Sequence, residues 1–310
     1  QQGKNNIAIK YSEDCLEIFR SIEDKKGIAN TLNVLGLINY DIGEYEKAKI
    51  YLNESLILKR ELGNKIGICS TLNSLGLIYL ICGEFDTAKV LLEEGLILAN
   101  EAKDDMYLSI CYNNLAEVYA NLDDNEKSKE YFELALDIDK KLGNKKGICV
   151  TLYNLGMMAY TNKDFEKAKP IYEESYALSM ELEYRLISMY NLVGLGQVSV
   201  ATNKIENAVK YYSECLNLLK EHYDMKCAVL TLMGFAEIYT IKKNYELAVK
   251  LMTVVKIKCD STGTVIDKNF NSMTDTILNS VKKEIGSEKT DKLIEMSKTI
   301  TFEDAIEMAL

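Results

Sequence analysis

The chain has 310 residues, of which 47% are hydrophobic and 27% are charged, and its formal net charge is −10. This composition is typical of a folded protein. The negative charge argues against nucleic-acid binding by this segment, because such a surface repels phosphate backbones. No signal peptide and no apolar run of about 18 residues is present, so we expect a cytoplasmic chain that does not enter a membrane. One proline, no tryptophan and missing strand patterns favour a helical protein.

The first predicted element, over residues 4–21, looks like the second helix of a repeat whose first helix is missing. Ala8 and Cys15 take the positions that Ala48 and Ser55 take 40 residues later. Because the chain also lacks an initiator methionine, we expect it to be a piece of a longer protein. Further repeats or another domain would then lie upstream.

Six full repeats of 40 residues are predicted to follow, from about residue 24 to residue 258, after the partial repeat at residues 1–23. Each repeat reads as a first helix of about 17 residues and a second of about 18 residues, and each helix carries a small residue in its apolar stripe. In the first helices the small residues are Gly36, Gly76, Ala116, Gly156, Gly196 and Ala236. In the second helices they are Ala48, Ala88, Ser128, Ala168, Ala208 and Ala248. A period of 20 to 50 residues indicates a solenoid or another repeat array.

This unit resembles the tetratricopeptide repeat in its extended, 40-residue form. The shared features are a leucine before the small residue, as at Leu75 and Gly76, a tyrosine three residues later, as at Tyr79, and the small residue of the second helix. Three repeats depart from the pattern at the tyrosine position, with Asn39, Ala159 and Ser199. The resemblance covers about residues 1–258. It implies an all-α fold, a right-handed superhelical solenoid of antiparallel helix pairs, closed by capping helices in residues 259–310.

Glycine and asparagine are expected to separate one repeat from the next. Gly63 can end a helix in the left-handed conformation, and Asn64 can cap the N-terminus of the following helix. Gly143 and Asn144 repeat this pair in the same register. Aspartates are expected to cap second helices directly, at Asp124 and Asp164.

The period stops after about Lys258, and the remaining residues are predicted to cover the end of the array. Cys259–Gly263 reads as a short polar link, and Thr264–Ile285 reads as a helix with an apolar face. The last stretch, from residue 284, is similar to the closing segment of bacterial signal-transduction ATPases and LuxR-type regulators. Thr301 and Asp304 also form a helix start signal. The residues that carry the resemblance are Ile300, Thr301, Glu303, Ala305, Ala309 and Leu310, while Ser297 replaces the usual glycine.

No motif for chemistry is present. The sequence contains no P-loop, no GxSxG and no HExxH pattern, and its single histidine, His222, leaves little for a catalytic relay. The eight cysteines are scattered, and no pair has the CxxC spacing of a metal site. Cys69 and Cys149 are interpreted as small buried residues in a reducing compartment. We therefore expect no enzymatic activity, no cofactor and no metal.

Binding is better supported, by a second stripe on each first helix, called here the first-helix stripe. In the first repeat it consists of Asn30, Asn33, Leu37 and Tyr40, and the family resemblance places it on the concave side of the superhelix. Neighbouring helices pack about 8–10 Å apart, and an extended peptide advances about 3.3 Å per residue. One asparagine per repeat could thus meet every third peptide residue. The alternative is that each asparagine is simply a polar residue on a solvent-exposed surface, with no partner. In the six repeats, the position of Asn33 is occupied in turn by Asn33, Asn73, Asn113, Tyr153, Val193 and Met233.

Other positions of the stripe add acidic, aromatic and sulfur-containing side chains. Tyr and Met at helical spacing fit either a core or an adaptable binding surface. The predicted partner-binding residues are Asn30, Asn33, Tyr40, Asn73, Asn113, Glu117, Tyr153, Met157, Tyr160, Tyr190, Gln197 and Met233.

The sequence therefore predicts a module that binds a protein or peptide, as the sensing part of a larger cytoplasmic regulator of signal transduction or transcription. Two alternatives stay open. One is a structural scaffold that assembles with copies of itself, and the other is a stand-alone adaptor similar to kinesin light chain.

Overall fold

The computed structural model describes residues 2–262 and 270–309, and this part of the chain contains sixteen α-helices and no strands. The helices are α1 (Gln2–Ser21), α2 (Lys25–Asp41), α3 (Tyr45–Glu61), α4 (Lys65–Ile81), α5 (Phe85–Ala102), α6 (Asp105–Asn121), α7 (Asn125–Leu142), α8 (Lys145–Thr161), α9 (Phe165–Glu181), α10 (Arg185–Ala201), α11 (Ile205–Glu221), α12 (Met225–Ile241), α13 (Tyr245–Thr262), α14 (Phe270–Ile285), α15 (Ser287–Ser297) and α16 (Phe302–Ala309). The all-α helix-pair fold is confirmed, with the even-numbered helices from α2 to α12 as first helices.

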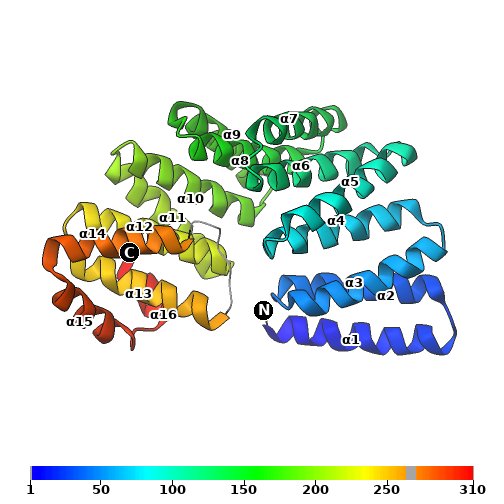
Figure 1. Cartoon of the computed structure of the whole chain (residues 1–310), viewed down its shortest axis with the longest axis horizontal. Helices are drawn as coiled ribbons and strands as arrows, with labels where there is room; N and C mark the ends of the chain where they lie inside the picture. The colour runs from blue at the N-terminus through cyan, green and yellow to red at the C-terminus, as the bar shows by residue number, and fades with distance from the viewer. Residues whose placement is uncertain (1, 263–269, 310) are drawn as a thin grey trace. The chain divides into compact units, whose positions relative to one another are not determined.

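The chain divides into two compact units, Gln1–Gly147 and Ile148–Leu310. In the first unit each helix from α1 to α7 packs on the next one along the chain, and α4 also contacts α2 and α6, the first helices of the adjacent repeats (Figure 1). In the second unit the same order holds from α9 to α13, and α10 contacts α12. Each unit therefore has its own layered core between first and second helices.

The small residues at the 40-residue period mark where a second helix packs closely on a first helix. A Cβ atom added to Gly36 would lie 2.6 Å from Leu52 Cγ, and one added to Gly76 would lie 2.6 Å from Leu92 Cγ. In each pair the leucine follows the glycine by sixteen residues and is fully buried. A larger side chain at the glycine would displace the leucine, so the prediction of close helix approach is confirmed at these positions.

A hydrogen bond between the two helices of a repeat recurs at a spacing of 26 residues. Ser55 Oγ donates to the Ala29 carbonyl at 2.7 Å, and Ser109 Oγ donates to the Ala135 carbonyl at 3.3 Å. Cysteines take the same role in other repeats, in the contacts Cys69 to Gly95 O, Cys149 to Ser175 O and Cys215 to Met189 O. Because Cys69 and Cys149 are buried free thiols that pack as small residues, their predicted structural role is confirmed.

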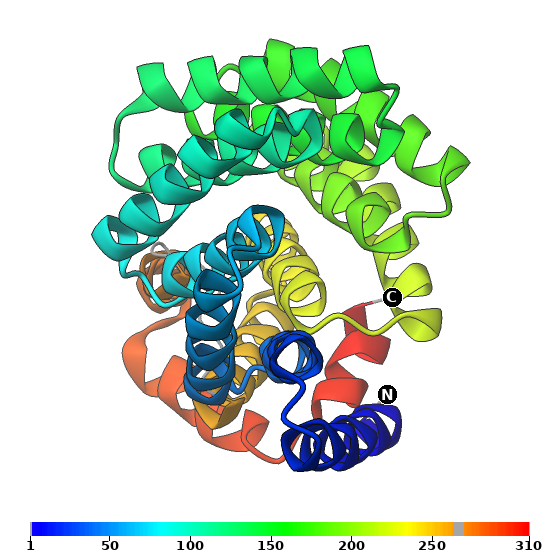
Figure 2. The same cartoon turned by 90° about the vertical axis from the view of Figure 1, so that its right-hand side faces the viewer.

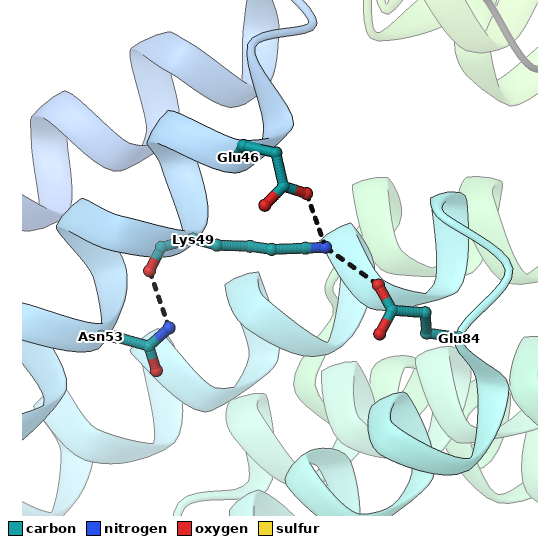
Figure 3. Close-up of polar contacts among 4 residues, drawn as sticks. All are labelled: Glu46, Lys49, Asn53 and Glu84. Atoms are coloured by element: carbon teal, nitrogen blue, oxygen red, sulfur yellow. Dashed lines mark hydrogen bonds and ion pairs between the residues drawn. The ribbon is translucent and has the colours of Figure 1, made fainter.

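Ion pairs link the exposed ends of neighbouring helices. Lys49 Nζ lies between two carboxylates, 3.0 Å from Glu46 Oε1 and 2.9 Å from Glu84 Oε1 (Figure 3). Asn53, one turn further along α3, donates to the Lys49 carbonyl. Both carboxylates are well exposed, so each pair contributes at most about 1 kcal/mol.

The predicted helix ends are confirmed where glycine and asparagine meet. Gly63 and Gly143 have φ angles of 65° and 64°, a backbone conformation that favours glycine. Asn64 Oδ1 accepts from the Gly67 amide, and Asn144 Oδ1 accepts from the Gly147 amide. The aspartate caps are also present, at Asp124 for α7 and at Asp164 for α9.

The C-terminal residues differ in part from the prediction. The polar link expected at Cys259–Gly263 is wrong for residues 259–262, because α13 continues to Thr262 with Cys259 only 5% exposed. Helices α14, α15 and α16 lie around α13 (Figures 1 and 2), and Val281 and Phe302 are buried there. The first part of the helix predicted at Thr264–Ile285, up to residue 269, and Leu310 lie outside the described residues.

The start signal of the last helix is confirmed. Asp304 N donates to Thr301 Oγ1 at 3.0 Å, and Thr301 N donates to Asp304 Oδ2 at 3.3 Å. This reciprocal pair fixes the first turn of α16. No helix of the described chain is long and apolar enough to cross a membrane, and no group of three or more described His, Cys, Asp or Glu side chains could hold a metal ion.

Candidate functional site

The first-helix stripe is partly open in both units. In the first unit Asn30 is exposed, whereas Asn33, Tyr40, Asn73, Asn113 and Glu117 are half-buried. In the second unit Met157 is exposed, whereas Tyr153, Tyr160, Tyr190 and Gln197 are half-buried. Half-buried side chains on a helix surface have one end fixed by packing and one end toward solvent. The contacts of each side chain therefore decide which atoms are left for a partner.

A buried lysine fixes the orientation of Asn33. Lys59 Nζ donates to Asn33 Oδ1 at 2.9 Å and to Thr71 Oγ1 at 2.7 Å. Since lysine has donors only, the oxygen of the Asn33 amide must face inward. The Nδ2 group of Asn33 is then directed away from Lys59, as a donor with no partner among the described residues.

Lys59 is unusual because its side chain is only 4% exposed and forms no salt bridge with a described carboxylate. It extends from α3 between α2 and α4, where the neutral oxygens of Asn33 and Thr71 replace a counter-ion. Burial disfavours the charged form and lowers the pKa of Lys59 to about 8.

Asn73 has the same orientation through a different contact. Asn114 Nδ2, on α6, donates to Asn73 Oδ1 on α4 at 2.5 Å. The Nδ2 group of Asn73 is therefore also directed away from its fixed oxygen. Two successive positions of the stripe thus present N–H donors, which select acceptors such as peptide carbonyl groups.

Tyrosine and glutamate occur together twice, at the same spacing. In the first unit the pKa of Tyr40 is raised to about 12. Burial is the largest cause, and the charges of Tyr45, Asp41 and Glu117 add to it. In the second unit burial and the charge of Glu237 raise the pKa of Tyr160 to about 12. Tyr40 precedes Glu117 by 77 residues, and Tyr160 precedes Glu237 by 77 residues. In both units a glutamate 77 residues after a stripe tyrosine thus contributes to the raised pKa of that tyrosine.

The second unit is lined by aromatic side chains. The ring centroids of Tyr153 and Tyr190 are 5.5 Å apart, and those of Tyr153 and Tyr172 are 6.1 Å apart. Tyr153 Oη also lies 3.8 Å from Met157 Sδ. Tyr190 reaches Asp224 at 3.4 Å. Tyr153 on α8 and Tyr190 on α10 give this unit an aromatic stripe where the first unit has amides, whereas Tyr172 on α9 is fully buried.

Met233 corrects the predicted binding set. The sequence predicts that it lines an open groove, but its side chain is 2% exposed and packs in the core of the second unit. Val193, at the same repeat position, is 3% exposed. Leu232, Val229 and residues of α13 and the C-terminal helices share this core, so neither side chain is accessible to a partner in this conformation.

Two residues of the site were not predicted from the sequence. Lys59 stands next to Arg60 in a charged stretch, and nothing in the local pattern indicates that it is buried. Glu237 could have been found, because it takes the stripe position of Glu117, Met157 and Gln197 at the 40-residue period.

A family model of the tetratricopeptide repeat matches residues 1–61, 67–141 and 147–221. The chain belongs to the tetratricopeptide repeat family. No curated protein sequence matches it. The geometry agrees with the family assignment, since the matched residues are the helix pairs described above.

Solved structures with a similar fold include a quorum sensor and a Rap protein. The apo form of the quorum sensor NprR from B. thuringiensis is 14% identical, with 94% of this chain and 86% of that chain covered and a TM-score of 0.69. A Rap protein complexed with competence and sporulation factor is 12% identical, with 99% and 86% covered and a TM-score of 0.66. NprR in complex with its cognate peptide NprX is 13% identical, with 98% and 84% covered and a TM-score of 0.58. At these identities the likeness concerns the fold.

Proposed function

We propose that this tetratricopeptide repeat chain binds an extended peptide segment along its first-helix stripe. The observation that carries the proposal is the shared orientation of Asn33 and Asn73, whose oxygens are occupied and whose Nδ2 groups remain as donors. Carbonyl groups along a peptide main chain are acceptors at regular spacing. The two donors can therefore bind carbonyl groups of a peptide main chain whatever side chains the peptide carries.

The amide and aromatic parts of the stripe would then have different tasks. Asn33 and Asn73 would hold the main chain of a peptide segment that lies on the first unit. Tyr153, Tyr190 and Met157 would contact the side chains of a segment that lies on the second unit, through apolar surface. Peptide binding by NprR, a protein of the same fold, supports this hypothesis.

The sharpest test replaces the amide donors and keeps the inward oxygens. Asn33→Asp and Asn73→Asp preserve the shape of each side chain, and the new carboxylate at position 33 can still accept from Lys59. Two lost hydrogen bonds, of about 0.5–1.5 kcal/mol each, should weaken the binding of captured peptides roughly 5- to 150-fold. Asn53→Asp, on the exposed side of α3 (Figure 3), is the matched control and should bind like the wild type.

The measurement is a peptide-array screen, followed by fluorescence anisotropy with the captured peptides. Equal binding by the wild type and the folded double variant would contradict the role of the asparagines. A wild-type chain that captures no peptide would contradict the proposed function itself.

We further propose that the chain is the sensing part of a larger cytoplasmic regulator. NprR, a quorum sensor, has the same fold, and the net charge of −10 supports a partner without phosphate groups. The gene sequence upstream of residue 1 tests this. A nucleotide-binding or DNA-binding domain there would support a regulator, and a start codon without any further domain would favour a stand-alone adaptor.

Self-assembly is a second candidate function, and one observation favours it. Four β-branched side chains on α3 and α5 are about two-thirds exposed, at Ile50, Ile57, Val90 and Ile97. Sedimentation velocity over a concentration series separates the two functions. A monomer at all concentrations supports peptide binding, whereas a dimer that Ile57→Glu and Ile97→Glu dissociate supports self-assembly.

A further inference from the structure

Asn33 and Asn73 take the same position on two first helices, α2 and α4, that are in direct contact. Lys59 Nζ donates to Asn33 Oδ1 on α2 and to Thr71 Oγ1 on α4, and these two oxygens lie 3.0 Å apart. Helices that pack on one another have axes about 8–10 Å apart. Because the two asparagines are related by one 40-residue repeat, their Nδ2 groups recur along the stripe at about this helix spacing.

Of the two regular extended conformations of a peptide, β and polyproline II, this spacing fits the second. In a β-strand, carbonyl groups on the same side recur every second residue, at about 6.6 Å and again at about 13 Å. A polyproline II helix has three residues per turn and a rise of about 3.1 Å per residue, so equivalent carbonyl groups recur at about 9.3 Å. Only this last distance lies within the helix spacing of about 8–10 Å. A polyproline II segment can therefore present one carbonyl group to Asn33 and the third one after it to Asn73.

The two amides offer donors to a ligand and no acceptor. The oxygen of Asn33 is occupied by Lys59, and the oxygen of Asn73 is occupied by Asn114. A polyproline II helix has no internal hydrogen bonds, so its carbonyl groups are open to such donors. Proline lacks the N–H group and keeps the carbonyl group. A proline-rich segment therefore meets the demand of this site completely, whereas a site that also bonded peptide N–H groups would reject proline.

Two leucines accompany the two amides at the same period. Leu37 and Leu77 follow Asn33 and Asn73 by four residues, which places each leucine beside its asparagine on one helix face. Leu37 is 39% exposed, and Leu77 is half-buried. In a polyproline II helix every third side chain lies along the same edge. The leucines can therefore contact two side chains that are also three residues apart, and the apolar ring of proline suits both positions.

We propose that the first unit binds a proline-rich peptide segment in the polyproline II conformation, with two main-chain carbonyl groups three residues apart accepting from Asn33 and Asn73. This inference rests on the proposed function and names the class of peptide that the amide part of the stripe selects. A proline-rich segment adopts the polyproline II conformation before it binds. It therefore loses less conformational entropy on binding than a flexible segment of the same length.

The first test compares two fluorescein-labelled peptides of equal length, decaproline and five Gly-Ser repeats, by fluorescence anisotropy. The wild type should bind decaproline about tenfold or more tightly than the flexible peptide. The double variant Asn33→Asp, Asn73→Asp should weaken decaproline binding roughly 5- to 150-fold, and Asn53→Asp should bind like the wild type. Equal binding of the two peptides, or no binding of decaproline, would overturn the inference. The proposed function would still stand if the peptide array captures other peptides.

The second test changes the peptide, so it does not depend on the folding of a variant. In the tightest peptide from the array, each main-chain carbonyl oxygen is replaced in turn by sulfur, a weaker hydrogen-bond acceptor. Two positions three residues apart should lose affinity, one of them insensitive in Asn33→Asp and the other insensitive in Asn73→Asp.

Other patterns of sensitivity separate the inference from the proposed function. Sensitive positions two or four residues apart would indicate a β-strand, and they would overturn the inference while the proposed function stands. A peptide that binds without any sensitive position would overturn it as well. A chain that binds neither decaproline nor any peptide of the array would contradict the proposed function itself.

Discussion

Lys59 Nζ lies 2.9 Å from Asn33 Oδ1, and this contact decides which end of the Asn33 amide is left for a partner. Burying a lysine without a carboxylate beside it costs free energy, because the charged amine loses its contact with water. The position is occupied by different residues in other repeats, including Ala99 and Asp139, so the array does not need a lysine there to fold. We infer that Lys59 positions Asn33 for binding.

The pH dependence of stability tests the burial of Lys59. Its pKa falls from 10.5 to about 8 on folding, so between these pH values the unfolded chain binds more protons than the folded chain. The free energy of unfolding should therefore rise with pH in this window, by up to roughly 1.4 kcal/mol per pH unit. Lys59→Met, which keeps the aliphatic stem, should lack this contribution.

The measurement is urea unfolding of both proteins at several pH values from 7 to 10.5. At each pH, the free energy of unfolding of Lys59→Met is subtracted from that of the wild type. The subtraction removes the contribution of the tyrosines, which titrate in the same pH range. A constant difference across the series would mean that Lys59 is solvated in the folded chain.

Gly156→Leu tests the close packing of a first helix on a second helix. A Cβ atom at Gly156 would lie 2.8 Å from Tyr172 Cδ1, and Tyr172 is fully buried. Overpacking should lower the free energy of unfolding by about 1–3 kcal/mol or more. Met157→Leu, at the next and exposed position of α8, should leave the unfolding curve unchanged. An unchanged curve for Gly156→Leu would argue against the repeat register.

The helix-to-helix hydrogen bond at the 26-residue spacing gives a separate stability prediction. Ser55→Ala removes the bond to the Ala29 carbonyl in a fully buried position and should cost about 0.5–1.5 kcal/mol. Ser74→Ala is the control, because that hydroxyl only bonds back to Ser70 within its own helix. Thermal unfolding of both variants checks the prediction, and equal midpoints would show that the cross-helix bond adds nothing.

The helix pairs could be predicted from the sequence because the period is regular and the signals are local. Glycines such as Gly36 stand where a neighbouring helix leaves no room for a side chain, and Asn64 satisfies amides of its own helix. Each of these signals acts within one repeat. The end of α13 was missed, because the polar residues after Cys259 resemble a linker while the helix continues through them.

The binding stripe could be predicted only in outline. Its register follows from the repeat, but the burial of Met233 depends on the hydrophobic core around it, to which the C-terminal helices contribute. Lys59 was missed because its burial results from three helices that meet around it. The orientation of the Asn33 and Asn73 amides likewise depends on residues far away in the sequence.

The most direct test of peptide binding observes the two amide groups themselves. In a ¹⁵N-labelled chain, the side-chain NH₂ resonances of Asn33 and Asn73 can be assigned from the Asn33→Asp and Asn73→Asp spectra. Addition of a captured peptide should shift both pairs of resonances at saturation, while the NH₂ resonances of Asn53 stay in place. If the peptide binds and the resonances of Asn33 and Asn73 do not move, the first-helix stripe is not the binding site.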